Sequence, residues 1–345
     1  MKRYHAFKEL FLCRMRQFYR EPEAIFWTYG FPILLTAGLG IAFRNRPPER
    51  VEVAIEDAPA TQQIREILAK DEGFEVEVGS ADECARLLRL GNAEILVAAT
   101  ETGYEYRYDP TRSETNLARY KVDDALQRAA GRRETVEVEE VHVTEPGARY
   151  IDFLVPGLLG MNLMGGGLWG VGFVTVDMRI RKLLKRLLAT PMRKRDFLLS
   201  VIGGRMIFTL PEMFVLLLTG WLLFRIAIVG SVLNIFCVSL VGGLSFAGIG
   251  LLTACRAKKL ETISGLMNLV MLPMWLFGGI FFSSGRFPDA MQPFVQALPL
   301  TQLNNALRAV ILEGASLASQ ALPLLILAAW GSISFALGLR WFRWT

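Results

Sequence analysis

The sequence predicts a polytopic α-helical membrane protein with six transmembrane helices and an inserted extracytoplasmic α/β domain. Of its 345 residues, 52% are hydrophobic and only 21% are charged, a balance too apolar for an ordinary soluble enzyme of this length. The charges also gather in one segment, because residues 44–150 hold 15 Lys or Arg and 23 Asp or Glu side chains. The rest of the chain is basic and contains long uncharged runs. An acidic, water-soluble insert therefore interrupts a membrane-embedded remainder.

Six apolar runs set the expected membrane topology, since a helix needs about 20 apolar residues to cross a bilayer. The expected transmembrane helices lie at 24–43, 151–176, 197–224, 227–254, 260–282 and 322–339. We expect a cytoplasmic amphipathic interface helix over 1–23 and a five-helix membrane domain over 151–345. The stretch 283–321 is too polar and proline-broken to span, so external hairpin-like helices are expected over 283–316.

Lys and Arg side chains mark one side of the membrane. Residues 1–23 hold six of them and residues 177–196 hold eight. Two further segments expected on that side hold Arg256, Lys258, Lys259, Arg340 and Arg343. Cytoplasmic loops carry the excess of Lys and Arg. Both termini are therefore expected in the cytoplasm, at a plasma membrane of the bacterial inner-membrane type, with the acidic insert outside.

The insert alternates strand-like and helical stretches. Alternating or continuous apolar patterns predict strands at 51–57, 74–78, 93–99, 104–109 and 135–143. Helical spacing predicts helices at 60–70, 81–91 and 110–130, and the inner positions expected in the last are Leu117, Tyr120, Val122 and Leu126. A domain of this size can fold alone. Its role is open between a recognition surface or lid and a structural cap that gives a dimer its outer contacts.

The loop from Asp177 to Pro191 is the most informative cytoplasmic segment. Its apolar side chains follow helical spacing and form one stripe, made of Ile180, Leu183, Leu184, Leu187 and Leu188. Lys185, Arg186 and other basic residues occupy much of the remaining surface. Such an amphipathic helix can lie on an anionic leaflet with its basic face toward the headgroups, or it can dock into a cytosolic partner. The residues by themselves favour neither alternative.

Two features inside the expected spans bear on mechanism. The second span has Gly165, Gly166 and Gly167 in a row, which favours close helix packing over a bending point. Arg205 and Glu212 share one face of the third span, and intramembrane charges are costly enough to indicate a function. Arg205 is near the basic loop, however, so its guanidinium can also reach toward the interface.

The sequence carries little that points to chemistry of its own. The four cysteines show no C-x-x-C spacing and the two histidines are far apart, so a catalytic or metal site has almost no support. No G-x-x-x-x-G-K-[ST] motif occurs, so this chain cannot hydrolyse ATP alone. The basic residues flank apolar runs, which indicates contact with membrane lipid and gives no reason to expect nucleic acid.

Two motifs connect these features to a known family. The loop KLLKRLLATPMRKRDFLLSVIGGRM (182–206) resembles the segment after the second span of ABC-2 type permeases, the membrane subunits of type V ABC exporters. The segment LPLTQLNNALRAVI (298–311) resembles a late segment of the same proteins, and the order of elements matches along the whole chain. The resemblance implies a transport subunit that pairs with a second copy or a similar permease. It also implies a separate cytosolic ABC ATPase, which binds the ATP and Mg, and no cofactor in this chain.

The resemblance implies that 177–191 is a coupling helix docking on the ATPase, with contact residues Ile180, Leu183, Leu184, Lys185, Arg186 and Leu187. We expect the second and fifth spans to line a substrate path through Met161, Asn162, Met164, Met267 and Met271. Such a surface suits efflux of a lipophilic or amphiphilic substrate from the cytoplasm or inner leaflet. The competing functions are a secondary transporter or channel, and a membrane-anchored sensor or envelope assembly factor.

Overall fold

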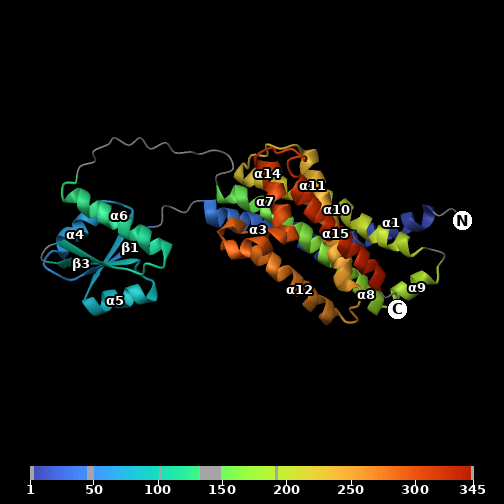
Figure 1. Cartoon of the computed structure of the whole chain (residues 1–345), viewed down its shortest axis with the longest axis horizontal. Helices are drawn as coiled ribbons and strands as arrows, with labels where there is room; N and C mark the ends of the chain where they lie inside the picture. The colour runs from blue at the N-terminus through green and yellow to red at the C-terminus, as the bar shows by residue number, and fades with distance from the viewer. Residues whose placement is uncertain (1–3, 45–49, 101–102, 133–148, 191–192, 343–345) are drawn as a thin grey trace. The chain divides into compact units, whose positions relative to one another are not determined.

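A computed structural model describes residues 4–44, 50–100, 103–132, 149–190 and 193–342. The chain divides into two compact units, one formed by Asn45–Val143 and the other by Met1–Arg44 with Thr144–Thr345. The first unit is the α/β insert and the second is the helical membrane unit (Figure 1). Each unit has hydrophobic core clusters made only of its own residues.

Within the described residues, the membrane unit has six stretches of helix long and apolar enough to cross a bilayer, which confirms the predicted fold class. They are Pro22–Ala42, Tyr150–Ile180, Asp196–Phe224, Val232–Ala254, Leu260–Phe277 and Ala321–Trp341. The elements of this unit are α1 (Tyr4–Arg20), α2 (Pro22–Ile25), η1 (Phe26–Gly30), α3 (Phe31–Arg44), α7 (Tyr150–Gly167), η2 (Leu168–Phe173), α8 (Val174–Ile180), α9 (Leu183–Leu188), α10 (Lys194–Phe224), α11 (Val232–Ala254), α12 (Leu260–Phe277), η3 (Ser284–Arg286), η4 (Asp289–Met291), α13 (Gln292–Ala297), α14 (Pro299–Leu312) and α15 (Ala321–Trp341). The short helices expected after the fifth span are therefore present.

The fourth span begins later than predicted, at Val232 and not at residue 227. Arg225 takes a left-handed conformation (φ 51°), which ends α10. The residues that follow leave the helix and bond to α14, where the Val229 N–H donates to the Ile311 carbonyl at 2.9 Å. Apolar composition alone does not reveal this exchange of helical for tertiary hydrogen bonds.

The fifth span ends earlier than predicted, at Phe277. Gly279 follows in the left-handed region (φ 70°), where glycine is strongly favoured. Side chains of α14 then take up the carbonyl groups that the helix end leaves unpaired. Asn304 Nδ2 donates to the Gly278 carbonyl at 2.7 Å, and the Arg308 guanidinium donates to the Gly279 carbonyl.

Glycines bring the central helices into main-chain contact. A Cβ atom added at Gly250 of α11 would lie 2.7 Å from the carbonyl oxygen of Gly167 in α7. One added at Gly248 would lie 2.6 Å from the carbonyl oxygen of Gly331 in α15. We call the contacts of these four residues the glycine seam. Since no larger residue fits there, these glycines serve close helix packing, as predicted for Gly167, whereas a Cβ atom at Gly165 would meet nothing within 4 Å.

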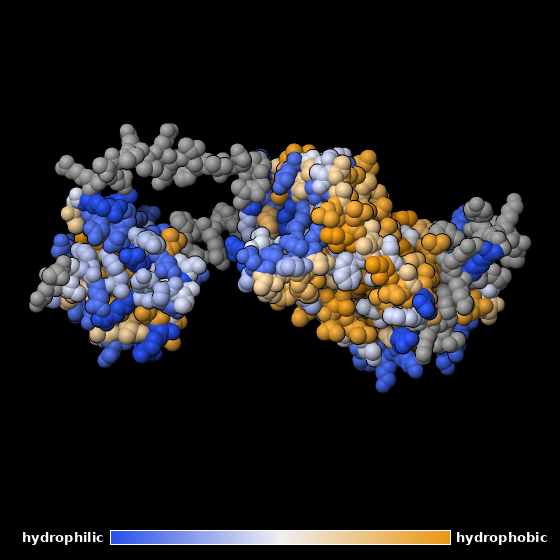
Figure 2. Space-filling model, in the orientation of Figure 1, coloured by the Kyte–Doolittle hydropathy of each residue, from blue (hydrophilic) through white to orange (hydrophobic). Residues whose placement is uncertain are grey.

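The remaining spans form the outside of the membrane unit. In the apolar stretch of the second span 72% of the residues are buried, and in the fourth span 67% are. The corresponding shares are only 17%, 22% and 22% in the first, fifth and sixth spans. Their exposed side chains are largely apolar, among them Trp27, Leu269 and Leu322. Figure 2 shows this hydrophobic surface in orange over the membrane unit. Such a surface suits contact with lipid or with another transmembrane subunit.

The insert, within its described residues, is a four-stranded sheet with helices on both faces. The strands are β1 (Val51–Glu56), β2 (Phe74–Gly79), β3 (Ile95–Thr100) and β4 (Gly103–Arg107), and the helices are α4 (Thr61–Leu68), α5 (Ala81–Leu90) and α6 (Ser113–Ala129). The strand order is β2-β1-β3-β4, with β1 parallel to both neighbours and β3 antiparallel to β4. These elements lie where the sequence predicts them, and the fifth predicted strand, 135–143, falls outside the described residues.

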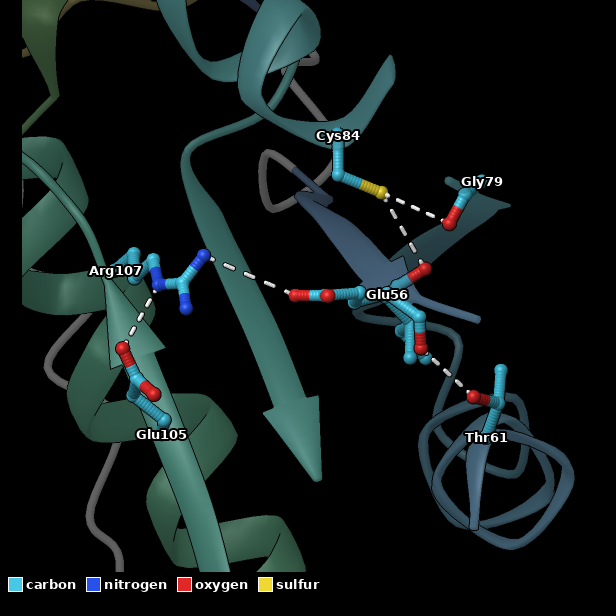
Figure 3. Close-up of polar contacts among 7 residues, drawn as sticks. Glu56, Thr61, Gly79, Cys84, Glu105 and Arg107 are labelled. Atoms are coloured by element: carbon cyan, nitrogen blue, oxygen red, sulfur yellow. Dashed lines mark hydrogen bonds and ion pairs between the residues drawn. The ribbon is translucent and has the colours of Figure 1, made fainter. Parts of the chain in front are cut away.

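The two faces of this sheet are packed differently. Helices α4 and α6 cover one face, whereas α5 covers the other with Cys84 against Ala54 and Leu96. The Cys84 thiol lies 3.5 Å from the Gly79 carbonyl oxygen, and burial raises the pKa of this thiol (Figure 3). Beside α5, Arg107 of β4 reaches Glu56 of β1 at 3.8 Å, so an ion pair crosses the sheet over β3.

The inward face of α6 is only half predicted. Val122 and Leu126 are fully buried, as expected, but Leu117 is 55% exposed and Tyr120 is 65% exposed. The buried positions are Thr115, Ala118, Val122 and Leu126. Small side chains, Thr115 and Ala118, are therefore buried where α6 lies close to the sheet. The prediction that Leu117 and Tyr120 face inward was wrong.

Candidate functional site

The predicted coupling segment consists of two short helices and not one. Helix α8 ends at Ile180 as the continuation of the second span, and α9 begins at Leu183. Between them Lys182 takes a left-handed conformation (φ 56°), which is uncommon for a residue other than glycine. The break separates Ile180 from Leu183, so the continuous apolar stripe expected over 177–191 does not form.

The inner face of α9 is occupied by the protein's own core. Leu184 is only 1% exposed and belongs to a cluster with Phe197, Leu251 and Phe342, and Leu187 packs against the same cluster. Leu184 is therefore an anchor that fixes α9 to the ends of the spans. It cannot also contact a partner in this conformation, which corrects its place among the expected contact residues.

The outer face of α9 carries the exposed charges. Lys185 and Arg186 are exposed, and Leu183 and Leu188 beside them are half-buried. We call these four residues the α9 outer face. It combines two positive charges with partly exposed apolar side chains, which is a suitable surface for an acidic groove on another protein or for anionic headgroups.

Helix α1 packs against the membrane unit near this region. The ring centroids of Phe18 in α1 and Phe208 in α10 lie 4.0 Å apart. Arg14 Nη2 donates to Met178 Sδ of α8 at 2.9 Å. The amphipathic N-terminal segment is thus helical, as predicted, and part of its face contacts α10 and α8.

Arg205 and Glu212 form a buried ion pair within α10. They are 8% and 1% exposed, and Arg205 Nη2 lies 2.6 Å from Glu212 Oε2, with a second contact between Nη1 and Oε1. The guanidinium lies across α7, where a Cβ atom at Gly166 would overlap it. Arg205 thus turns toward Glu212 and does not extend to the interface.

The expected substrate path is divided between buried and partly exposed residues. Met164 and Met267 are fully buried and Met271 is 4% exposed, so in this conformation they belong to the core of a single copy. Met161 and Asn162 are half-buried, and Asn162 Nδ2 donates to the Thr28 carbonyl at 3.3 Å. Met161 also packs against the core cluster of the membrane unit.

Sequence reasoning assigned no role to the polar face of α14. Arg308 Nε donates to the Phe153 carbonyl at 3.2 Å, and its guanidinium lies 3.6 Å from the centroid of the Phe153 ring. Burial in this position lowers the pKa of Arg308 to about 10. The available signal was the spacing of Thr301, Asn304 and Arg308 along one face of an otherwise apolar helix.

In the part of the chain that the structure describes, no three His, Cys, Asp or Glu side chains are grouped to hold a metal ion. The described helices thus form a bundle of six apolar spans with a short basic helix after the second one. A family model described as "ABC-2 family transporter protein" matches residues 22–340. The chain therefore belongs to the ABC-2 family of transporter proteins.

Two curated proteins are similar to about half of the chain. The ABC transporter G family member 20 of Dictyostelium discoideum is 26% identical over 174 residues, which are 50% of this chain and 24% of that protein. The inner membrane transport permease YadH of Escherichia coli K12 is 25% identical over 164 residues, which are 47% of this chain and 63% of that protein. The chain thus spans less than two thirds of the length of either relative.

Proposed function

We propose that this chain is the permease half of an ATP-driven exporter and that the α9 outer face docks on a separate cytosolic ABC ATPase, which binds the ATP and Mg. The observation that carries the proposal is that α9 has one buried face, which anchors it, and one exposed basic face. Leu184 packs into the core of the membrane unit, while the charged side chains of Lys185 and Arg186 are exposed. Family membership supports an ATPase partner, since this chain has no nucleotide-binding motif of its own.

The test is recruitment of the ATPase in detergent, where no anionic leaflet exists. Lys185→Glu with Arg186→Glu should abolish co-purification of the partner ATPase, because docking needs charge complementarity. Arg86→Glu with Arg89→Glu is the matched control, since it makes the same change of charge on exposed residues of α5 in the insert. Normal recruitment by the α9 variant would leave this helix as a lipid-surface anchor.

We further propose that two permeases assemble around a path for a lipophilic or amphiphilic substrate leaving the cytoplasm or inner leaflet. The low burial and apolar surface of the first and fifth spans support a second transmembrane copy. Met161 and Asn162, being half-buried, are the best placed of the expected path residues. Mass measurement in mild detergent should give two permeases and two ATPases, and a stable active single permease would contradict the pairing.

The proposed direction of transport requires α9 in the cytoplasm and the insert outside. The basic loops support this orientation. Cysteines introduced at Asp57 and Lys185, both exposed, should differ in intact cells. An impermeant thiol reagent should label the residue 57 variant, and should label the residue 185 variant only after the membrane is opened. Labelling of residue 185 in intact cells would show that α9 lies outside and that the proposed topology is wrong.

A further inference from the structure

A single arginine joins the ends of three spans at the base of α9. Arg179, in the last turn of α8, donates from Nη1 to the carbonyl groups of Ala254 and Ala257 at 2.9 and 2.8 Å. Ala254 is the last residue of α11, and Ala257 lies in the link to α12. The Arg179 guanidinium carbon also lies 4.9 Å from the ring centroid of Phe342, directly after α15.

One nitrogen of the Arg179 guanidinium makes both main-chain contacts. The last turn of a helix leaves carbonyl groups without intrahelical partners, and the two N–H groups of Nη1 can donate to two of them at once. No carboxylate lies within ion-pair distance of Arg179 among the described residues, so main-chain carbonyls and a ring take the place of a counter-charge. Nε and Nη2 are buried and have no hydrogen-bond partner in that part of the chain, so these donors are available for other carbonyls if the helix ends shift.

Helix α9 holds the same helix ends by a second contact. Leu184 lies in the cluster that contains Leu251 of α11 and Phe342. Phe342 thus contacts both the arginine of α8 and the cluster that anchors α9. The two attachments lie on either side of the left-handed turn at Lys182, so a displacement of α9 acts on the ends of α11 and α15.

The neighbouring Arg181 provides a contrast. It lies two residues further along, is exposed, and pairs with Asp177 of its own helix at 2.9 Å. Surface pairs of this kind contribute little to stability and bind no other element. The two arginines therefore have the same charge at nearly the same place, and only Arg179 bridges separate spans.

Arginines fasten the second span elsewhere in the same way. Arg149, directly before α7, donates from Nη1 to the Phe224 carbonyl at the end of α10 at 3.0 Å. Arg308 bonds the Phe153 carbonyl of α7 and the Gly279 carbonyl beyond α12. Arginine side chains thus connect the second span to carbonyl groups at the ends of α10, α11 and α12. Arg179 is the one of these arginines nearest to α9.

We propose that Arg179 is the positioning residue that transmits movement of α9 to α11, α12 and α15. The inference rests on the proposed function, since it requires an ATPase to move α9. When the ATPase displaces α9, the guanidinium carries the carbonyls of Ala254 and Ala257 with it, so the start of α12 moves too. Without this side chain, α9 still binds and moves, but the fifth span does not follow.

The test uses the complex of the full-length permease with its ATPase and two reporter positions. An environment-sensitive fluorophore is attached at Ala189→Cys, the exposed residue directly after α9 and outside its outer face, or at Glu261→Cys, exposed in the first turn of α12, with Cys13→Ser removing an exposed native thiol. Addition of ATP should change the signal at both positions in the wild type. In Arg179→Gln the change at residue 189 should remain and the change at residue 261 should be lost. Arg181→Gln, the matched control, should keep both.

Each outcome separates the two proposals. A full change at residue 261 in Arg179→Gln would overturn the role of Arg179. Absence of an ATPase complex with the wild type would overturn the proposed function instead. Should Arg179→Gln fail to fold, Arg179→Lys, which keeps the charge but not the planar guanidinium over Phe342, and Phe342→Leu, which removes the ring, should each reduce the change at residue 261 alone. If both signals decrease equally and the unfolding temperature falls, Arg179 only stabilises the fold and does not transmit movement.

Discussion

Two adjacent glycines in α7 show that the role of a residue depends on which side of the helix it faces. A Cβ atom at Gly165 would meet nothing within 4 Å, whereas one at Gly166 would overlap the guanidinium of Arg205. The sequence presents the two as equivalent. Only the rotation of α7 against α10 assigns one of them to the ion pair and the other to open space.

We therefore expect Gly166→Ala to destabilise the protein and Gly165→Ala to be neutral or mildly stabilising. Overpacking a filled site costs about 1–3 kcal/mol, and the displaced Arg205 would strain its contact with Glu212. Replacing a helical glycine by alanine in open space has no such cost. Thermal unfolding of both variants in detergent checks this. Equal unfolding temperatures would mean that Arg205 moves aside freely.

The ion pair itself gives a second prediction. Removing one partner of a buried pair leaves the other charge uncompensated, at a cost of about 3–5 kcal/mol, whereas replacing both by apolar residues is often neutral. Glu212→Gln should therefore lower the unfolding temperature far more than Arg205→Met combined with Glu212→Leu. If the double variant is stable but its complex with the ATPase no longer transports, the pair has a role beyond stability. A double variant less stable than the single one would show that the pair stabilises the fold.

Residue-level roles were predictable where spacing alone decides them. The seven-residue separation of Arg205 and Glu212 places them on one helix face, but it left open whether Arg205 reaches toward the interface, and only the structure shows that it pairs with Glu212. The burial of Met164 and Met267 was not predictable, because it depends on which neighbours surround α7 and α12. The same holds for Arg308, whose role depends on carbonyls released at a helix end far away in the sequence.

At the scale of elements, α9 separates anchoring from recognition. Leu184→Ala should destabilise the membrane unit by about 2–5 kcal/mol, as expected for truncating a buried leucine. Leu183→Ala, on the half-buried outer face, should have little effect on stability and should weaken ATPase recruitment. Unfolding temperature and co-purification, measured on both variants, check the assignment. Reversed effects would mean that α9 turns over when its partner binds.

Apolar length predicted the spans well but not where local backbone ends them. The break before Leu183 depends on one left-handed lysine, and the periodicity of leucines on both sides conceals it. The glycine-rich composition predicted close packing, yet it did not identify which helix meets which. Pairing of α11 with α15 arises from tertiary structure and has no local signal.

At the scale of the whole molecule, the insert should fold without the membrane unit. Its core clusters contain only its own residues, and α5 is closed by a capping box between Ser80 and Glu83. A fragment spanning 45–148 should be soluble and unfold cooperatively. Its buried Cys84, whose thiol pKa is raised by burial, should react with a maleimide only after denaturant is added. Immediate labelling of the native fragment would mean that the domain needs the rest of the chain.

The glycine seam has a consequence for biosynthesis. Its contact between Gly167 and Gly250 can close once the fourth span has left the ribosome, but the contact between Gly248 and Gly331 must wait for the last helix. Until then the surface of α11 around Gly248 faces lipid, which cannot fill a groove shaped for a backbone. The bundle is therefore completed only after α15 has been translated, and a chain released before that point would present this open groove to the quality-control machinery of the membrane.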